Sequence, residues 1–393
     1  MRESATSFNQ ECGAPIDCPN KIWQPLADPD FVSQVRNFAQ ARIAPEADRI
    51  DREDVYPLEI IRDFAKAGLT RTVVPTEYGG KGDFRLTAAL FEEIAYASCA
   101  AAISLVTIFQ AMTMIRLFAS QSLKDRYIPE IANGLACSYS LTETSHGSDI
   151  RSLDTKAVRA GDEWILTGEK SFITSGDKAE FFVMLAETPV GVSAFAIPYP
   201  LPGLEKYVGE HSSTFGMRNG PHVNMRLKEV RLPADHLIGI EGKGVRQAAT
   251  TLNYSRNCAA AVSIGIARSA FDGALARARG RIAFDNTILN LQGIQWYFAE
   301  MLADIDASRL LVYRAAQALN DDNDIDRYSS VAKLKAGRVA TETCLTAMQI
   351  CGAWGTSDNT PFGRYLRDAK TYEIGGGSAE ILKNTIAKYI IRG

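Results

Sequence analysis

A short polar segment, "SLTETSHGSD" at residues 140–149, contains residue types that bind a phosphate or a polar heterocycle. Thr142, Ser145 and Ser148 supply hydroxyl groups, and Gly147 lets a ligand approach the backbone closely. Clusters of Ser, Gly and Asp are also common in ordinary turns. Taken alone, the segment leaves a ligand-binding loop and a plain turn both open.

A second segment, "GEKSFITSG" at 168–176, places an aromatic ring and a hydroxyl two positions apart. In an extended strand such side chains share a face, so we expect Phe172 and Thr174 to project on the same side. The ring is then able to stack on a ligand while the hydroxyl forms a hydrogen bond. Packing of Phe172 in the core is the alternative.

The secondary structure predicted along the 393 residues changes twice, from helices to strands and back to helices. From Phe31 to Glu130 the apolar residues recur every three or four positions, which predicts helices. Short aromatic and β-branched runs with intervening turns then predict strands. Helical periodicity returns at 244–279, 286–320, 328–351 and 378–390, and predicts a four-helix bundle. We therefore expect an α+β protein with a polar N-terminal tail (1–25), an N-terminal helical domain (26–134), a middle β domain (135–240) and a C-terminal helical bundle (241–393).

Composition excludes several classes of protein. The chain is 46% hydrophobic and 23% charged, with a formal net charge of −3, so no overall bias toward nucleic acid or an anionic membrane is present. The longest apolar run, 258–267, is too short to span a bilayer, and residues 1–25 lack the apolar core of a signal peptide. The seven cysteines and four histidines show no metal-ligand spacing. We expect a cytoplasmic protein without a metal site.

In this order, the segments resemble those of the acyl-CoA dehydrogenase superfamily from about Phe31 to the C-terminus. "LTETSHGSD" is similar to the flavin-binding L-T-E-x-x-x-G-S-D, and "FITSG" to W-I-T-N-G, with Phe172 in place of the tryptophan beside the isoalloxazine. "RIAFDNTILNLQ" (281–292) resembles R-x-x-F-G-x-x-x-x-x-x-Q, and "MQICGAWG" (348–355) resembles Q-x-x-G-G-x-G. Asp285, Ala353 and Trp354 depart from these patterns.

The resemblance implies a helical domain, a β-barrel-like middle domain and a C-terminal four-helix bundle, with FAD as cofactor and a CoA thioester as substrate. It places Thr174 near flavin N5 and Ser148 near the cofactor phosphates. The 281–292 segment reaches FAD across a subunit interface in this superfamily, which implies a homodimer at least and favours a dimer of dimers. The FAD-binding residues carried over are Leu141, Thr142, Ser148, Phe172, Thr174, Arg281, Phe284, Gln292, Gln349 and Gly352.

In this superfamily a glutamate at one of two positions removes the α-proton of the substrate. One position, in "TYEIGGGSAE" (371–380), is Gly376 here, and the other, before an arginine on the first bundle helix, is Ser255 before Arg256. A serine hydroxyl is not basic near neutral pH without a partner. Because a positioned base is worth ~10²–10⁴ in rate, these residues argue against ordinary desaturation.

The pattern without a base resembles the 3-sulfinopropionyl-CoA desulfinases of this superfamily. Loss of the sulfinate gives propionyl-CoA and sulfite without abstraction of the α-proton, so an electron-transferring flavoprotein is not required. Arg85 is our candidate for binding the sulfinate through its guanidinium fork. Gln247 lies eight residues before Ser255 on the same predicted helix face, and with Arg256 completes the substrate-binding candidates. The alternatives are a surface salt bridge for Arg85 and a surface amide for Gln247.

Three other functions remain open. The main rival is an acyl-CoA or acyl-carrier-protein dehydrogenase in which Glu373, three residues before Gly376, is a relocated base and an electron-transferring flavoprotein is the acceptor. The second is a flavin monooxygenase or cyclopropanating enzyme acting on carrier-protein substrates. The third is a non-catalytic or DNA-binding relative, but the C-terminal "KNTIAKYIIRG" carries only Lys383, Lys388 and Arg392.

Overall fold

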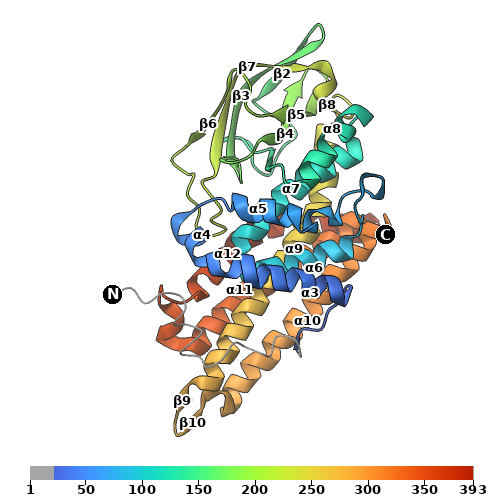
Figure 1. Ribbon diagram of the computed structural model, residues 1–393. Helices are drawn as coiled ribbons and strands as arrows, with labels where there is room; N and C mark the ends of the chain where they lie inside the picture. Colours follow the sequence, from blue (N-terminus) through green and yellow to red (C-terminus); the bar gives the residue numbers. More distant parts are fainter. Residues whose placement is uncertain (1–21, 393) are drawn as a thin grey trace.

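The computed structural model describes residues 22–392, so most of the polar tail expected at 1–25 lies outside the described residues. The protein has three parts: a group of helices, a sheet and a long helical bundle (Figure 1). The sheet stands at one end of the molecule, and the N-terminal helices cross between it and the bundle. The expected α+β architecture is confirmed.

The N-terminal part is helical, and polar caps mark where its helices begin. The Asp83 carboxylate accepts from the backbone N–H of Arg85 at 2.8 Å, at the start of α6. Ser98 caps α7 in the same way, through the N–H of Ala101. The helices are α3 (Pro29–Phe38), α4 (Ala47–Glu53), α5 (Leu58–Lys66), α6 (Phe84–Ala97), α7 (Cys99–Phe118) and α8 (Gln121–Ala132).

The middle part is an eight-stranded sheet with the order β6-β7-β3-β2-β4-β5-β8, and β1 pairs with β4 in parallel. Side chains of β3 and β7 alternate between buried and exposed, whereas nearly all of β4 is buried, as its apolar sequence "FFVMLA" requires. The strands are β1 (Cys137–Ser140), β2 (Lys156–Ala160), β3 (Glu163–Ile173), β4 (Phe181–Thr188), β5 (Gly191–Pro198), β6 (Leu204–Val208), β7 (Val223–Pro233) and β8 (Leu237–Ile238).

The sheet curls around a core of its own. Trp164, Phe182, Phe195 and Leu227, from four different strands, belong to one buried cluster. The rings of Trp164 and Phe195 meet edge to face, with centroids 5.3 Å apart. The other apolar cluster joins the helices to one face of β1, β4 and β5, so the sheet is fixed to the bundle by packing.

The C-terminal part contains five helices and a small hairpin. Helical periodicity predicts a helix over 286–320, but α10 begins only at Gln292 because residues 282–287 form a hairpin. Phe284 and Asp285 both have positive φ (52° and 59°), as a two-residue hairpin turn requires. The helix α12 lies between the segments for which helices are predicted. The elements are α9 (Gly244–Gly280), β9 (Ile282–Ala283), β10 (Asn286–Thr287), α10 (Gln292–Asn320), α11 (Ile325–Cys351), α12 (Phe362–Ile374) and α13 (Ala379–Arg392).

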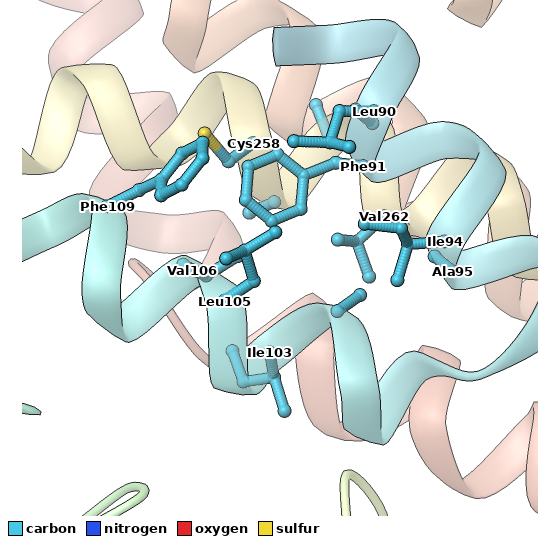
Figure 2. Packing of buried hydrophobic residues seen from close by; sticks show 14 of the residues in the cluster. Leu90, Phe91, Ile94, Ala95, Ile103, Leu105, Val106, Phe109, Cys258 and Val262 are labelled. Carbon is cyan, nitrogen blue, oxygen red and sulfur yellow. The ribbon is translucent and has the colours of Figure 1, made fainter. Parts of the chain in front are cut away.

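The main core lies where α6 and α7 pack on α9. The rings of Phe91 and Phe109 meet edge to face at 5.2 Å, beside Cys258 of α9 (Figure 2). A Cβ at Gly265 of α9 would lie 2.4 Å from the backbone oxygen of Glu92, so the two helices approach closely there. By length and composition α7 and α9 resemble membrane spans, but 78% and 100% of their most apolar stretches are buried in the protein, as in core helices.

Candidate active site

The two segments expected to bind the flavin lie side by side. The backbone N–H of Ser171 donates to the carbonyl of Thr142 at 2.9 Å, and the hydroxyls of Thr144 and Ser171 are also 2.9 Å apart. A buried ion pair joins Lys170 to Glu143, with Nζ and Oε1 2.7 Å apart. The sequence predicts each segment separately. The structure joins them through a backbone hydrogen bond and a buried ion pair.

Phe172 presents its ring to solvent beside these hydroxyls. It is 46% exposed, and its φ of 56° turns the chain at a register shift between β3 and β7. The strand ends at Ile173, so Thr174, which is half-buried, lies in the following turn. His211 stacks parallel to Phe172, with ring centroids 6.2 Å apart. Phe172 therefore does not pack in the core.

A cavity of about 470 Å³ connects this region to the end of α12. Phe172, His211 and Phe215 line it from the sheet side, and Thr371 and Ile374 line it from α12. Ile374 is the last residue of that helix. The aromatic segment and the C-terminal motif thus border one space.

The loop after α12, Gly375–Gly377, is called the glycine loop here, and it contains the first expected base position. Gly376 is exposed, has a φ of 70°, and has no atom within 4 Å of the place of a Cβ. A Cβ at Gly377 would lie 3.5 Å from Nε of Arg256. The loop is therefore open at Gly376 and backed by a guanidinium at Gly377.

A buried lysine holds the glycine loop from below. Nζ of Lys333 donates to the carbonyl oxygens of Glu373 and Gly377, each at 2.8 Å. Burial, and secondarily repulsion from Arg256, lowers the pKa of Lys333 to about 8. Attraction to the Glu373 carboxylate opposes the shift, but the hydrogen bonds of Lys333 go to backbone carbonyls and not to that carboxylate.

Arg256 is the second buried cation beneath the glycine loop. Its Nη1 donates to Asn253 at 2.8 Å and to the hydroxyl of Ser330 at 3.3 Å, while Nε has no partner within residues 22–392. Burial lowers the pKa of Arg256, and attraction to Asp326 opposes the shift. Two positive charges thus lie beside the glycine loop, which contains the first expected base position.

The other candidate bases are engaged elsewhere. The buried hydroxyl of Ser255 donates to the carbonyl of Leu252, 3.1 Å away within the same helix. The Glu373 carboxylate accepts from the Thr341 hydroxyl at 2.9 Å and from Lys370 at 3.1 Å. Because α12 ends at Ile374, helical spacing does not carry Glu373 onto the face of Gly376. This orientation gives no support to Glu373 as a base.

Arg85 does not lie where a buried sulfinate ligand is expected. Its side chain is exposed and donates from Nη2 to the carbonyl of Leu26 at 2.7 Å. It borders a surface cavity of about 580 Å³ that also contains Asp28 and Asp83. The reason is that Arg85 follows the capping residue of α6, and at that position its side chain turns toward the N-terminal segment.

Gln247, in contrast, is buried and not a surface amide. Its Nε2 donates to the carbonyl of Ile238 at 3.1 Å, and its Oε1 has no hydrogen-bond partner among the described residues. The amide closely approaches Gly239, where a Cβ would lie 2.0 Å from Nε2. Gln247 is therefore locked at the junction of the sheet and α9, with one acceptor unused.

Part of the expected FAD set lies at the far end of the bundle. Phe284 is 88% exposed, and Arg281 and Gln292 are exposed beside it. Figure 1 places the β9–β10 hairpin opposite the sheet, so these residues do not meet Thr142 or Phe172 within one chain. Contact with a flavin across a subunit interface stays a prediction.

The remaining FAD candidates lie in three places. Gln349 is exposed in the last turn of α11, and Gly352 ends that helix with a φ of 62°. The positive φ explains a glycine there. Leu141 is half-buried after β1, and Ser148 is exposed in the loop beyond it.

One cluster has donors that a metal ion accepts. Single ligand atoms of Glu143, His146 and Asp154 lie within 4.8 Å of one another. The Glu143 carboxylate, however, already accepts from Lys170 and from the backbone N–H groups of Asp154 and Thr155. The cluster is explained as the anchor of the polar loop.

Two functional candidates escape analysis of the sequence. Lys333 stands in "VAKLKAG", where Lys335 is an equally plausible surface residue, and helical spacing alone does not tell which one is buried. The other is Arg116, in the last turn of α7, which follows a long apolar run. A charge at the end of an otherwise apolar helix is a signal that identifies Arg116, and no comparable signal identifies Lys333.

The residues near Phe172 fit a flavin. An exposed aromatic ring, the Thr142 and Thr174 hydroxyl groups and the adjoining cavity supply the stacking surface and hydrogen bonds that a planar polar heterocycle needs.

Comparisons with known proteins agree with this geometry. Three sequence families match consecutive parts of the chain: the acyl-CoA dehydrogenase N-terminal domain at 28–135, the middle domain at 138–230 and the C-terminal domain at 242–391. A probable acyl-CoA dehydrogenase of Bacillus subtilis is 34% identical over 372 residues, 91% of this chain and 96% of the relative.

Solved structures give the same result. Butyryl-CoA dehydrogenase from Megasphaera elsdenii has a TM-score of 0.89 and 28% identity, covering 92% of this chain and 97% of the other. A chain in the structure of the electron transferring flavoprotein of Acidaminococcus fermentans has a TM-score of 0.90 and 30% identity, covering 93% and 97%. Members of this family bind FAD, which confirms the expected cofactor. The chain belongs to the acyl-CoA dehydrogenase family.

Proposed function

We propose that this family member is a 3-sulfinopropionyl-CoA desulfinase. In the proposed reaction, 3-sulfinopropionyl-CoA and water give propionyl-CoA and hydrogen sulfite. The C–S bond breaks, a C–H bond forms at the same carbon, and the oxygen of water goes to sulfur. No external oxidant or reductant is consumed.

The observation that carries the proposal is the charge beneath the glycine loop. The family resemblance places the carboxylate of a dehydrogenase at position 376 or 255, and Gly376 and Ser255 carry none. The adjacent Gly377 lies beside Arg256, and its carbonyl accepts from Lys333. Two buried cations attract an anionic substrate and stabilise an anionic leaving group.

The rival function is a dehydrogenase with a relocated base. The names of the relatives favour it, because they are dehydrogenases. The hydrogen bonds of Glu373, the candidate for a relocated base, count against it. They fix its carboxylate between Thr341 of α11 and Lys370 of α12. We therefore rank the desulfinase first.

The Thr142, Phe172 and Thr174 region would hold FAD, whose ribityl hydroxyl would polarise the thioester carbonyl. Arg256 and Lys333 would add positive charge to the site, and the buried Gln247 would offer its unused Oε1 to the substrate or to a water molecule. The exposed hairpin with Arg281, Phe284 and Gln292 supports assembly into a dimer or a dimer of dimers. The proposed reaction itself needs no electron-transferring flavoprotein.

The first experiment is to incubate the yellow protein with 3-sulfinopropionyl-CoA, without oxygen or an electron acceptor, and to assay sulfite while recording the flavin spectrum. Sulfite and propionyl-CoA in equal amounts over many turnovers support the proposal. Heat-denatured enzyme is the control for spontaneous release. No sulfite, together with flavin bleaching by butyryl-CoA, identifies a dehydrogenase and overturns the proposal.

A further inference from the structure

Arg116 lies in the last turn of α7, and its guanidinium packs beside a pair of aromatic rings whose centroids are 5.1 Å apart. Its Cζ is 5.4 Å from the ring centroid of Phe84, at the start of α6, and 5.2 Å from that of Tyr254, on α9. Both rings are buried, with exposed fractions of 5% and 7%. Three helices therefore meet around this one positive charge.

Arg116 is half-buried, and the buried part of its guanidinium lacks hydrogen bonds. Nε and Nη2 are buried, and neither has a partner within residues 22–392. Buried polar groups in proteins are normally hydrogen-bonded, because an unpaired one is costly. The aromatic rings attract the positive charge but satisfy no N–H group.

The position of Arg116 connects it to the proposed reaction centre. Tyr254 directly precedes Ser255, the second base position, and belongs to the same helix as Gln247. Positions 247, 251 and 254 recur at helical spacing on one face, and Thr251 contacts Met114 of α7 at 3.6 Å. The unused Oε1 of Gln247 and the unused N–H groups of Arg116 thus lie along the same α7–α9 contact.

The arrangement selects a ligand of particular chemistry. Two adjacent N–H groups of a guanidinium match two oxygen atoms of one carboxylate or sulfinate. Nε and Nη2 of Arg116 are such a pair, and the neighbouring rings of Phe84 and Tyr254 are apolar and buried. We propose that Arg116 binds the terminal anion of a short acyl chain, a carboxylate or a sulfinate. This proposal rests on the proposed function and names a specificity residue for it.

The test compares two CoA thioesters that differ in one group. Succinyl-CoA has the chain length of 3-sulfinopropionyl-CoA with a carboxylate in place of the sulfinate, and butyryl-CoA has a methyl group there. Dissociation constants for the FAD-loaded protein are measured by the change in flavin absorbance without oxygen. The variants are Arg116→Gln and Arg116→Lys, and the control is Arg126→Gln, an exposed arginine whose Cζ lies 4.9 Å from the Tyr127 ring centroid.

We expect the parent protein to bind succinyl-CoA more tightly than butyryl-CoA. Arg116→Gln should weaken succinyl-CoA binding by about 10- to 100-fold and butyryl-CoA binding by less than about threefold, as loss of a charged hydrogen bond predicts. Arg116→Lys, which keeps the charge but not the fork, should fall between and serves if the glutamine variant does not fold. Arg126→Gln should leave both constants unchanged.

The proposal is overturned if the parent protein does not bind succinyl-CoA more tightly than butyryl-CoA. It is also overturned if the Arg116 variants lose affinity equally for both thioesters, or lose none. Sulfite release separates this result from the proposed function. Selective loss of succinyl-CoA binding in a protein that releases no sulfite leaves Arg116 as an acyl-anion ligand of a different reaction. Sulfite release that Arg116→Gln does not change refutes the role of Arg116 and leaves the desulfinase standing.

Discussion

The helix α9 carries two buried arginines with opposite surroundings. Arg268 contacts carboxylates of Glu92 and Glu93 on α6, at 2.6 Å and 2.8 Å. Arg309 adds a second bond to Glu92 at 2.8 Å. Arg256, nearer the start of the helix, contacts an amide and a hydroxyl, and the nearby Lys333 contacts backbone carbonyls. Arg268 and Arg309 form direct ion pairs with carboxylates, whereas Arg256 and Lys333 form none among the described residues.

The difference separates charge that stabilises the fold from charge that is available to a ligand. Glu93, between Arg268 and Arg36, has its pKa lowered to about 2; burial alone would raise it, but the two arginines overcome that effect. Lys333 forms no direct ion pair among the described residues, and burial lowers its pKa although Glu373 attracts the charge. A buried cation without a direct ion pair is costly to keep, so we interpret the Arg256–Lys333 group as functional.

The largest loss of stability should come from breaking the buried ion pairs of Arg268. Arg268→Met removes the cation between Glu92 and Glu93 and leaves buried carboxylates with fewer partners. We expect the free energy of unfolding to fall by about 3–5 kcal/mol, seen as a lower denaturant midpoint or as insoluble protein. Arg231→Met, which breaks an exposed pair with Glu163, is the control and should cost about 1 kcal/mol or less. Equal free energies of unfolding for Arg268→Met and Arg231→Met would contradict a stabilising role of the buried ion pairs.

The second prediction adds a negative charge to the glycine loop. Gly376→Glu introduces a carboxylate at the first expected base position, next to Gly377, which contacts Arg256 and Lys333. The open space at Gly376 leaves room for the side chain. Sulfite release should fall about 100-fold or more because the carboxylate competes with the substrate anion, and anaerobic flavin bleaching by butyryl-CoA should appear. The gain from a new base is ~10²–10⁴.

The control for that variant is Gly376→Gln. It has the same cost of a side chain at a φ of 70°, about 1–2 kcal/mol, without the negative charge. It should lower the denaturant midpoint as much as Gly376→Glu does and should not bleach with butyryl-CoA. If both variants bleach, or neither does, charge at this position does not decide between the reactions.

The third prediction concerns pH. The pKa of Lys333 is about 8 in the folded protein, below the ordinary 10.5, so the side chain is charged below pH 8 and neutral above it. We expect kcat/KM for 3-sulfinopropionyl-CoA to fall above pH 8, by up to about tenfold per pH unit. Binding of butyryl-CoA should stay constant over the same range.

Stability should change in the opposite direction. Between pH 8 and 10.5 the unfolded chain keeps a proton on Lys333 that the folded chain has lost, so this group raises the free energy of unfolding as pH increases. Denaturant unfolding of the parent protein and of Lys333→Met across this range isolates the contribution. Parallel pH profiles for activity and stability contradict the role of Lys333.

Sequence periodicity is enough to predict the order of helical, β and helical parts, because each part buries its apolar residues at its own spacing. Local residue chemistry also identifies the two flavin-binding segments, but their contact through Thr142 and Ser171 depends on the fold. The charge group beneath the glycine loop depends on the fold as well. Lys333 and Gly377 are far apart in sequence, and only the packing of α11 against α12 brings them together.

Arginine side chains show the limit of sequence analysis most clearly. Arg85 follows a glycine-rich loop in a region that the resemblance connects with the acyl group, but it turns to the carbonyl of Leu26. Arg116 has no motif around it and nevertheless packs against both Phe84 and Tyr254. The direction of a long side chain depends on neighbours from distant segments, which spacing does not encode.

The smallest effect on activity should come from Arg85→Gln. Comparing it with Arg116→Gln shows which of the two arginines binds the substrate anion. An exposed hydrogen bond to a carbonyl contributes about 1 kcal/mol or less, so kcat/KM for 3-sulfinopropionyl-CoA should fall by no more than about fivefold. Arg116→Gln should reduce the same constant by at least tenfold, because its N–H groups are buried and unused. If Arg85→Gln instead has the larger effect and Arg116→Gln has none, Arg85 moves inward when substrate binds. The anion site then belongs to the start of α6 and not to the end of α7.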